Sequence, residues 1–268
     1  GIDMGGMSIK MGLVNEENKI IGRITIPTDL TVPYQTLVER MADAVRQMLE
    51  NAGMTLEQCG GIGIGSPGTI DAKQGVILYS NNFGWENVPI VEELKKHLDT
   101  RIEIANDADA AALGEVCAGA AEGAENAVLL TLGTGVGSGV ILDKKIFRGA
   151  MPGGCELGHL SIRYDGIRCT CGRKGCLEAY ASASALLRIA REKAAEHPES
   201  IMNEMCGNDL EQMNGKIPFD AAKAGDEAGM ETVKEYEGYL ACGIANVINT
   251  FRPEKVILGG GVAAQKEN

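Results

Sequence analysis

The sequence lacks several features that define common classes of protein. No apolar run approaches the roughly 20 residues that a membrane-spanning helix needs, and there is no low-complexity tract. Lysine and arginine total 25 against 37 aspartates and glutamates, and they form no basic stripe of the kind that binds nucleic acid. The first residues show no basic stretch followed by an apolar one, so we expect no secretion signal. We therefore expect a cytoplasmic protein with neither a membrane nor a nucleic acid as partner.

The eight cysteines do not suit a disulfide framework. Three of them lie close together within residues 169–176, whereas the others are scattered at Cys59, Cys117, Cys155, Cys206 and Cys242. Scattered cysteines in a chain of 268 residues are typical of a reducing compartment. The cluster of three therefore needs a separate explanation.

Two common nucleotide-binding motifs can also be set aside, one because it is absent and one because of its context. No G-x-x-x-x-G-K-[ST] sequence occurs, which disfavours a P-loop ATPase. Gly63-Ile-Gly65-Ser-Pro-Gly68 matches the dinucleotide pattern G-x-G-x-x-G and follows a predicted strand. However, Pro67 and residues 69–71 do not open an amphipathic helix, so a pyrophosphate would lack the helix N-terminus that binds it. We therefore reject a hydride-transfer enzyme.

The hydrophobic pattern predicts a mixed α/β protein. Residues 2–14 and 19–27 suit two or three antiparallel strands. Further strands are predicted at 61–65, 101–105, 127–133, 136–142 and 255–258, and helices at 36–51, 108–118, about 177–195 and about 226–251. A small polar connector at residues 120–126 marks a boundary. We therefore predict an N-terminal domain over residues 1–120 and a C-terminal domain over residues 121–268.

Two glycine-rich segments share the pattern of a strand, a glycine turn and a second strand. They cover residues 2–10 and 131–139, one in each half of the chain. Backbone N–H groups in such turns can surround phosphate oxygens. The alternative, that the glycines only form tight β-turns, stays open for either segment alone. Asp3, a candidate ligand for a Mg²⁺-bound water, favours the phosphate-binding interpretation.

His159 and the segment Cys169-Thr-Cys171-Gly-Arg-Lys-Gly-Cys176 predict a metal site. Three thiolates and one imidazole are the ligands that tetrahedral Zn²⁺ prefers. Four protein ligands leave no position for water, so we predict a structural rather than a catalytic zinc. The alternative is a group of free thiols beside an unrelated histidine.

Three acidic residues, Asp107, Glu156 and Glu178, flank the predicted metal segment in the sequence. Carboxylates commonly bind the hydroxyl groups of a polyhydroxylated ligand. Judged by residue type alone, each is more often a solvated surface charge. The metal would connect the segments that carry Glu156 and Glu178, and Asp107 falls between a predicted strand and a predicted helix.

Short motifs along the whole chain resemble those of one family, the ROK sugar kinases. They are Asp3-x-Gly5-Gly6, Gly65-x-Pro67-Gly68, Asn82-Phe-Gly-Trp85, Asn106-Asp107-Ala108, Leu132-Gly133-Thr134-Gly135, Glu156-x-Gly158-His159, Cys169-x-Cys171-Gly-x-x-Gly-Cys176-x-Glu178 and Gly259-Gly260-Gly261. Together these motifs are very specific. Within the family, the overall pattern is most similar to that of bacterial glucokinases.

The resemblance implies an actin-like, hexokinase-like ATPase fold of two α/β domains, with ATP and sugar in the cleft between them. It implies a homodimeric enzyme that uses ATP and Mg²⁺ to phosphorylate a hexose, with glucose expected, and Asp107 as the catalytic base. The sugar contacts that it implies are Gly65, Asn82, Asn106, Glu156, His159 and Glu178, with His159 also on zinc. The residues that it implies for phosphates, Mg²⁺ and adenosine are Asp3, Gly5, Gly6, Gly133, Thr134, Gly135, Gly260 and Gly261.

Two positions depart from the family pattern. Met7 stands where a threonine usually donates to phosphate, and Asp109 stands where asparagine is usual. N-acetylmannosamine, N-acetylglucosamine and fructose stay open as substrates of kinases in the same family. A sugar-sensing transcriptional repressor would need an N-terminal helix-turn-helix, whereas here the first glycine segment starts at Asp3. The presence of Asp107 argues against a module that only binds sugar.

Overall fold

The structure, a computed structural model, describes residues 1–263 and contains two units. The first comprises Gly1–Glu125 and Gly139–Cys155, and the second comprises Asn126–Ser138 and residues 156–263. The predicted division into domains of residues 1–120 and 121–268 stays a prediction. By packing, the chain changes unit at residue 126 and returns to the first unit for residues 139–155. No helix within residues 1–263 has the length and apolar content of a membrane-spanning segment.

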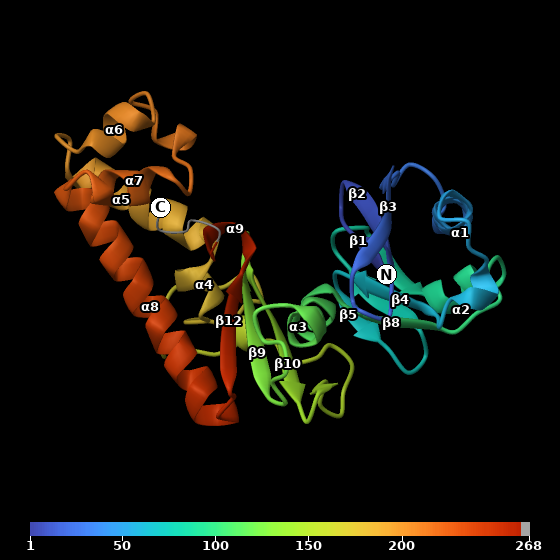
Figure 1. Cartoon of the computed structure of the whole chain (residues 1–268). Helices are drawn as coiled ribbons and strands as arrows, with labels where there is room; N and C mark the ends of the chain where they lie inside the picture. The colour runs from blue at the N-terminus through green and yellow to red at the C-terminus, as the bar shows by residue number, and fades with distance from the viewer. Residues whose placement is uncertain (264–268) are drawn as a thin grey trace. The chain divides into compact units, whose positions relative to one another are not determined.

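The first unit is built on a five-stranded sheet of order β3-β2-β1-β4-β8 (Figure 1). Its strands are β1 (Ile2–Met4), β2 (Ser8–Val14), β3 (Ile20–Pro27), β4 (Ile62–Ser66) and β8 (Ile102–Asn106). β1, β2 and β3 are antiparallel, as predicted, because tight turns connect them. β1, β4 and β8 are parallel, which places the carboxyl ends of these three strands at one edge of the sheet.

Helix α1 (Tyr34–Asn51) covers one face of this sheet. Its buried residues include Leu37, Met41, Val45 and Met48, which recur at helical spacing and pack with the apolar side chains of the strands. The helix begins two residues earlier than predicted, directly after Pro33, whose backbone is extended with ψ 147 and lies outside the helix. Burial of this apolar face holds the sheet in a single register.

A smaller three-stranded sheet and four further elements complete the first unit. The sheet has the order β5-β6-β7, and its strands are β5 (Thr69–Asp71), β6 (Val76–Ser80) and β7 (Trp85–Val88). The remaining elements are η1 (Leu56–Gln58), α2 (Ile90–Lys95), α3 (Asp107–Ala118) and β11 (Lys145–Ile146). β10 (Val136–Leu142) runs from the second unit into the first, where Ile141 pairs with Ile146 of β11.

The second unit combines a parallel strand pair with helices. β9 (Ala127–Leu132) and β12 (Lys255–Gly259) pair in parallel, with Gly259 opposite Thr131. The helical elements are η2 (Leu157–His159), α4 (Glu178–Ala181), α5 (Ala183–Glu196), α6 (Ile201–Met205), η3 (Leu210–Gln212), α7 (Ile217–Lys223), α8 (Glu227–Phe251) and α9 (Gly260–Ala263). The long helix α8 packs against α4, α5 and α7 (Figure 1).

The single helix predicted near residues 177–195 is two helices, so this prediction was wrong in detail. Ser182 has an extended backbone with ψ 167, and its side chain accepts a hydrogen bond from the N–H of Ala185. It therefore ends α4 and caps α5. The N–H of Ala183 donates instead to the carbonyl of Gly133, at 2.8 Å. The start of α5 is thus hydrogen-bonded to the second glycine-rich turn.

Candidate active site and metal centre

Asp107 lies where β8 ends and α3 begins, as predicted. The side chain of Asn106 caps α3 by accepting a hydrogen bond from the N–H of Ala108 at 2.9 Å. Its amide nitrogen donates to the carbonyl of Gly68 at 3.2 Å, which ties the end of β8 to the segment after β4. Asp107 Oδ1 also accepts from the N–H of Ala108, at 2.9 Å. The position of the Asp107 carboxyl is therefore set by the helix N-terminus.

The surroundings of Asp107 raise the pKa of its carboxyl above the ordinary value. Partial burial is the largest cause, and the nearby carboxylate of Asp3 adds to it, while the hydrogen bond from Ala108 opposes the change. The residue still has exposed surface, so a substrate can reach it. A carboxylate with a raised pKa is a better proton acceptor than an ordinary exposed aspartate.

Asp3, Gly65 and Asp107 line one cavity of about 900 Å³ in the first unit. They come from β1, β4 and α3, so the parallel strands and the following helix bring three of the predicted residues together. Gly65 is buried, and a Cβ there would lie 3.3 Å from the Cβ of Ala110. The exposed carboxylate of Asp3 offers the oxygen donors that Mg²⁺ prefers. Asn82 is exposed in the turn between β6 and β7.

The first glycine turn, between β1 and β2, is closed by a hydrogen bond from the N–H of Gly5 to the carbonyl of Ser8 at 3.0 Å. A Cβ at Gly5 would lie only 2.8 Å from that oxygen, so glycine is required there. Gly6 has open space around it, and Met7 is 90% exposed. Thr28 Oγ1 donates to the carbonyl of Gly5 at 2.6 Å, which anchors the turn to the segment after β3.

The second glycine turn, residues 133–135, lies at the carboxyl end of β9. The N–H of Gly133 donates to the carbonyl of Gly135 at 3.0 Å, and Ser184 Oγ donates to the carbonyl of Thr134 at 3.0 Å. Gly260, with φ 88, lies at the same end, next to Leu132, the last residue of β9. A Cβ at Gly260 would be 2.5 Å from the carbonyl oxygen of Leu132. Gly261 follows it on α9 and is exposed. The carboxyl ends of parallel strands are common places for ligand binding.

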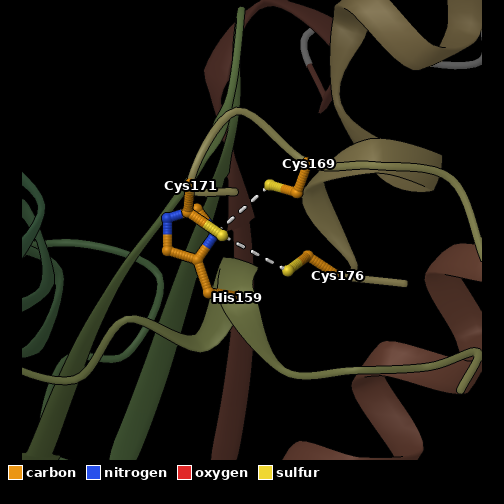
Figure 2. A group of neighbouring side chains, drawn as sticks. All are labelled: His159, Cys169, Cys171 and Cys176. Atoms are coloured by element: carbon orange, nitrogen blue, oxygen red, sulfur yellow. Dashed lines mark hydrogen bonds between the residues drawn. The ribbon is translucent and has the colours of Figure 1, made fainter. Parts of the chain in front are cut away.

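His159, Cys169, Cys171 and Cys176 point toward one another in the second unit (Figure 2). Their ligand atoms all lie within 4.8 Å of one another. The Sγ atoms of Cys171 and Cys176 are 3.6 Å apart, and Cys169 Sγ is 3.6 Å from His159 Nδ1. Zinc bonds of about 2.0–2.3 Å in a tetrahedron place the ligand atoms roughly 3.6–3.8 Å apart. The donor set and its spacing therefore fit Zn²⁺.

Burial is the largest influence on the pKa of two of these thiols, Cys169 and Cys176. It raises the pKa of Cys176 to about 12 and also raises that of Cys169. The exposed Cys171 has a lowered pKa, chiefly because a backbone N–H of Arg173 hydrogen-bonds to its sulfur. Buried thiols of this kind become thiolates only when a cation compensates the charge.

Glu156 and Glu178 occupy different positions beside the metal centre. Glu156 is exposed at the start of η2, and its carbonyl accepts a hydrogen bond from the N–H of His159 at 3.0 Å. Glu178, the first residue of α4, is partly buried, and its carboxylate accepts from the N–H of Val136 at 3.1 Å. The metal loop, which we define as residues 169–176, thus lies directly beside one end of the second glycine turn.

Sequence reasoning missed two contacts near these sites. The buried carboxylate of Asp109 lies 3.8 Å from Nε of Arg148, which lines the cavity beside Asp107. Thr170 Oγ1 donates to Glu178 Oε1 at 2.9 Å. Asp109 was singled out only as a departure from the family pattern, and nothing in the local sequence connects it to a residue 39 positions away. Thr170 stands between two metal ligands, which is the one signal that could have identified it.

The whole chain matches a known family. The match to the ROK family covers residues 1–267. The chain belongs to the ROK family. Among curated relatives, a glucokinase of Thermotoga maritima is 37% identical over 268 residues, which make up 100% of this chain and 83% of the relative.

Two solved structures of ROK proteins are similar to this one throughout. A ROK hexokinase from Thermus thermophilus has a TM-score of 0.83 at 33% identity, and the match covers 100% of this chain and 83% of that chain. A ROK family glucokinase from Streptomyces griseus, solved in complex with glucose and AMPPNP, has a TM-score of 0.77 at 32% identity, covering 98% and 83%. The predicted fold class, an actin-like α/β ATPase fold, is confirmed.

Proposed function

We propose that this ROK protein is a glucokinase that transfers the γ-phosphoryl group of ATP to glucose, forming glucose 6-phosphate. The observation that carries the proposal is the carboxyl of Asp107, which has a raised pKa and lines one cavity with Asp3. A base and a candidate metal-binding carboxylate are the two protein groups that phosphoryl transfer to a hydroxyl most needs. The similarity to glucokinases of the family supports glucose as the acceptor.

In this proposal Asp107 accepts the proton of the attacking sugar hydroxyl. Its position is fixed by Asn106 and the start of α3, so little reorganisation is needed when the hydroxyl arrives. Gly65, Asn82, Asn106, Glu156, His159 and Glu178 contact the sugar. The backbone N–H groups of the two glycine turns, with Gly5 and Gly6 in one and residues 133–135 in the other, hold the phosphates, and Gly260 and Gly261 face the adenosine.

Two metal ions have separate roles in the proposal. Mg²⁺, when bound beside Asp3, neutralises charge on the phosphate oxygens. His159, Cys169, Cys171 and Cys176 would hold a structural Zn²⁺ and so fix the segment that carries Glu156 and Glu178. Because all four ligands would come from the protein, the ion would serve the structure and not the reaction.

The test is a panel of four sugars: glucose, N-acetylglucosamine, N-acetylmannosamine and fructose. ADP release is measured by a coupled assay at fixed ATP and Mg²⁺, and glucose is expected to give the highest kcat/KM. Buried polar groups matched to glucose hydroxyls discriminate against analogues that leave those groups unpaired. If an N-acetylhexosamine exceeded glucose tenfold, about 1.4 kcal/mol in transition-state binding, the substrate assignment would be wrong while the kinase assignment stood.

We further infer a homodimer that works in the cytoplasm at the entry of glucose into glycolysis. Family resemblance supports the dimer. The scattered cysteines, of which none forms a disulfide in the described part of the chain, suit a reducing compartment. They are Cys59, Cys117, Cys155, Cys206 and Cys242. Light scattering coupled to gel filtration should give twice the chain mass of 28.3 kDa, and a monomeric mass in active protein would contradict the dimer.

A further inference from the structure

The carboxylate of Glu178 joins two segments that are far apart in the sequence. Glu178 Oε2 accepts a hydrogen bond from the backbone N–H of Val136, the first residue of β10, at 3.1 Å. Glu178 Oε1 accepts from the hydroxyl of Thr170 at 2.9 Å, and Cys169 Sγ lies 3.4 Å from the same oxygen. One oxygen therefore faces the glycine turn, and the other faces the metal loop.

The glycine turn is shaped to admit this carboxylate. A Cβ at Gly135 would lie 2.4 Å from Glu178 Oε2, so only glycine allows the close approach. The residues that follow Glu178 bind the same turn, because the N–H of Ala183 donates to the carbonyl of Gly133 and Ser184 Oγ donates to that of Thr134. The turn is thus held by hydrogen bonds from residues 178–184 along most of its length.

Thr170 is the one side chain of the metal loop that hydrogen-bonds to this arrangement without being a metal ligand. It stands between Cys169 and Cys171, so ligation of both neighbours would fix the direction of its hydroxyl. Its own surface is exposed, and its only described side-chain acceptor is the Glu178 carboxylate apart from the sulfur of Cys169. A hydrogen bond to a charged acceptor is stronger than one to a neutral group.

We propose that Thr170 is a positioning residue: through its hydrogen bond to the Glu178 carboxylate, the metal centre holds the turn of residues 133–135 in its phosphate-binding shape. This inference rests on the proposed function, because it takes the turn to bind nucleotide phosphates. Metal binding fixes the loop, the loop fixes Thr170, and Thr170 fixes the carboxylate that holds the N–H of Val136. The metal centre therefore controls affinity for nucleotide as well as the segment assigned to the sugar.

The test compares Thr170→Val, which removes the hydroxyl and keeps the shape, with Thr170→Ser, which keeps the hydroxyl. Calorimetry with AMPPNP and Mg²⁺, without sugar, gives the nucleotide Kd, and elemental analysis gives the zinc content. We expect Thr170→Val to retain one zinc per chain and to bind nucleotide about tenfold more weakly, because the carboxylate that holds the turn loses its hydrogen bond from Thr170. Thr170→Ser should bind within about twofold of wild type.

A second measurement separates coupling from a general loss of structure. Chelation of the metal should weaken nucleotide binding about tenfold in the wild type and by less than about threefold in Thr170→Val, because the connection is already broken there. Equal effects of chelation in the two proteins would overturn the proposal. So would a nucleotide Kd for Thr170→Val equal to that of wild type, or equal impairment in Thr170→Ser. Failure of the wild type itself to bind nucleotide would instead remove the proposed function, and this inference with it.

Discussion

At the scale of single residues, the carboxyl of Asp107 is subject to opposing influences. Partial burial and the carboxylate of Asp3 raise its pKa, and the N–H of Ala108 lowers it. The net pKa is raised. This balance makes the ionised carboxylate a stronger base than that of an exposed aspartate. The local structure therefore suits proton abstraction from a sugar hydroxyl.

The raised pKa of Asp107 predicts the position of the acidic limb of the pH–rate profile. The base must be deprotonated to act, so kcat/KM falls as pH falls through its pKa, which lies above the value of about 4 for an ordinary aspartate. Asp3→Asn removes a negative charge that raises this pKa, so the limb should move to lower pH even though the variant is less active. Profiles of kcat/KM from pH 4 to pH 8 test this, and an unmoved limb in Asp3→Asn would contradict it.

At the scale of elements, periodicity predicted most of the framework that carries the site. The junction of β8 and α3 follows from an apolar strand, the capping side chain of Asn106 and an alanine-rich stretch. β9 is a continuous apolar run, and α8 begins directly after Asp226, whose side chain caps it. The β5-β6-β7 sheet was not predicted, because its strands are three to five residues long and their ends depend on positive-φ glycines. Short strands carry too few apolar positions to define a period.

The break between α4 and α5 also depended on contacts that the sequence does not show. Residues 177–195 have continuous helical character, and Ser182 interrupts it because the N–H of Ala183 bonds to Gly133, 50 positions earlier. Site residues within one motif were easy to find, as in the metal loop of residues 169–176. The contact of Thr170 with Glu178 depends instead on the direction of two side chains, which spacing alone does not fix.

The metal centre gives a prediction at this scale. The protein as purified should carry one zinc per chain, and Cys171→Ser should lose it together with most activity, because three ligands bind far more weakly than four. Melting temperature should fall on chelation. Cys242→Ser, which removes an exposed cysteine on α8 outside the cluster, serves as the matched control and should keep both metal and activity. Active protein without zinc would refute the centre, as would Cys171→Ser with full metal content and turnover.

At the scale of the whole molecule, the residues of the proposed reaction are distributed over both units. Asp3, Asn106 and Asp107 belong to the first, and His159 and Glu178 belong to the second. The second unit also contains the metal centre and the second glycine turn. Asp107 and the metal centre therefore belong to different units, so Asp107 can be substituted without changing a metal ligand or its unit.

The most direct test of the account compares wild type with Asp107→Asn for glucose turnover and glucose binding. Turnover is measured as ADP release with ATP and Mg²⁺, and glucose affinity is measured by calorimetry. Asparagine keeps the shape and the hydrogen bond to the N–H of Ala108 but accepts no proton. The account predicts a glucose Kd close to that of wild type and a kcat lowered by about 10²-fold to 10⁴-fold, the usual contribution of a positioned general base. An unchanged kcat, or a loss of glucose binding with kcat preserved, would contradict it.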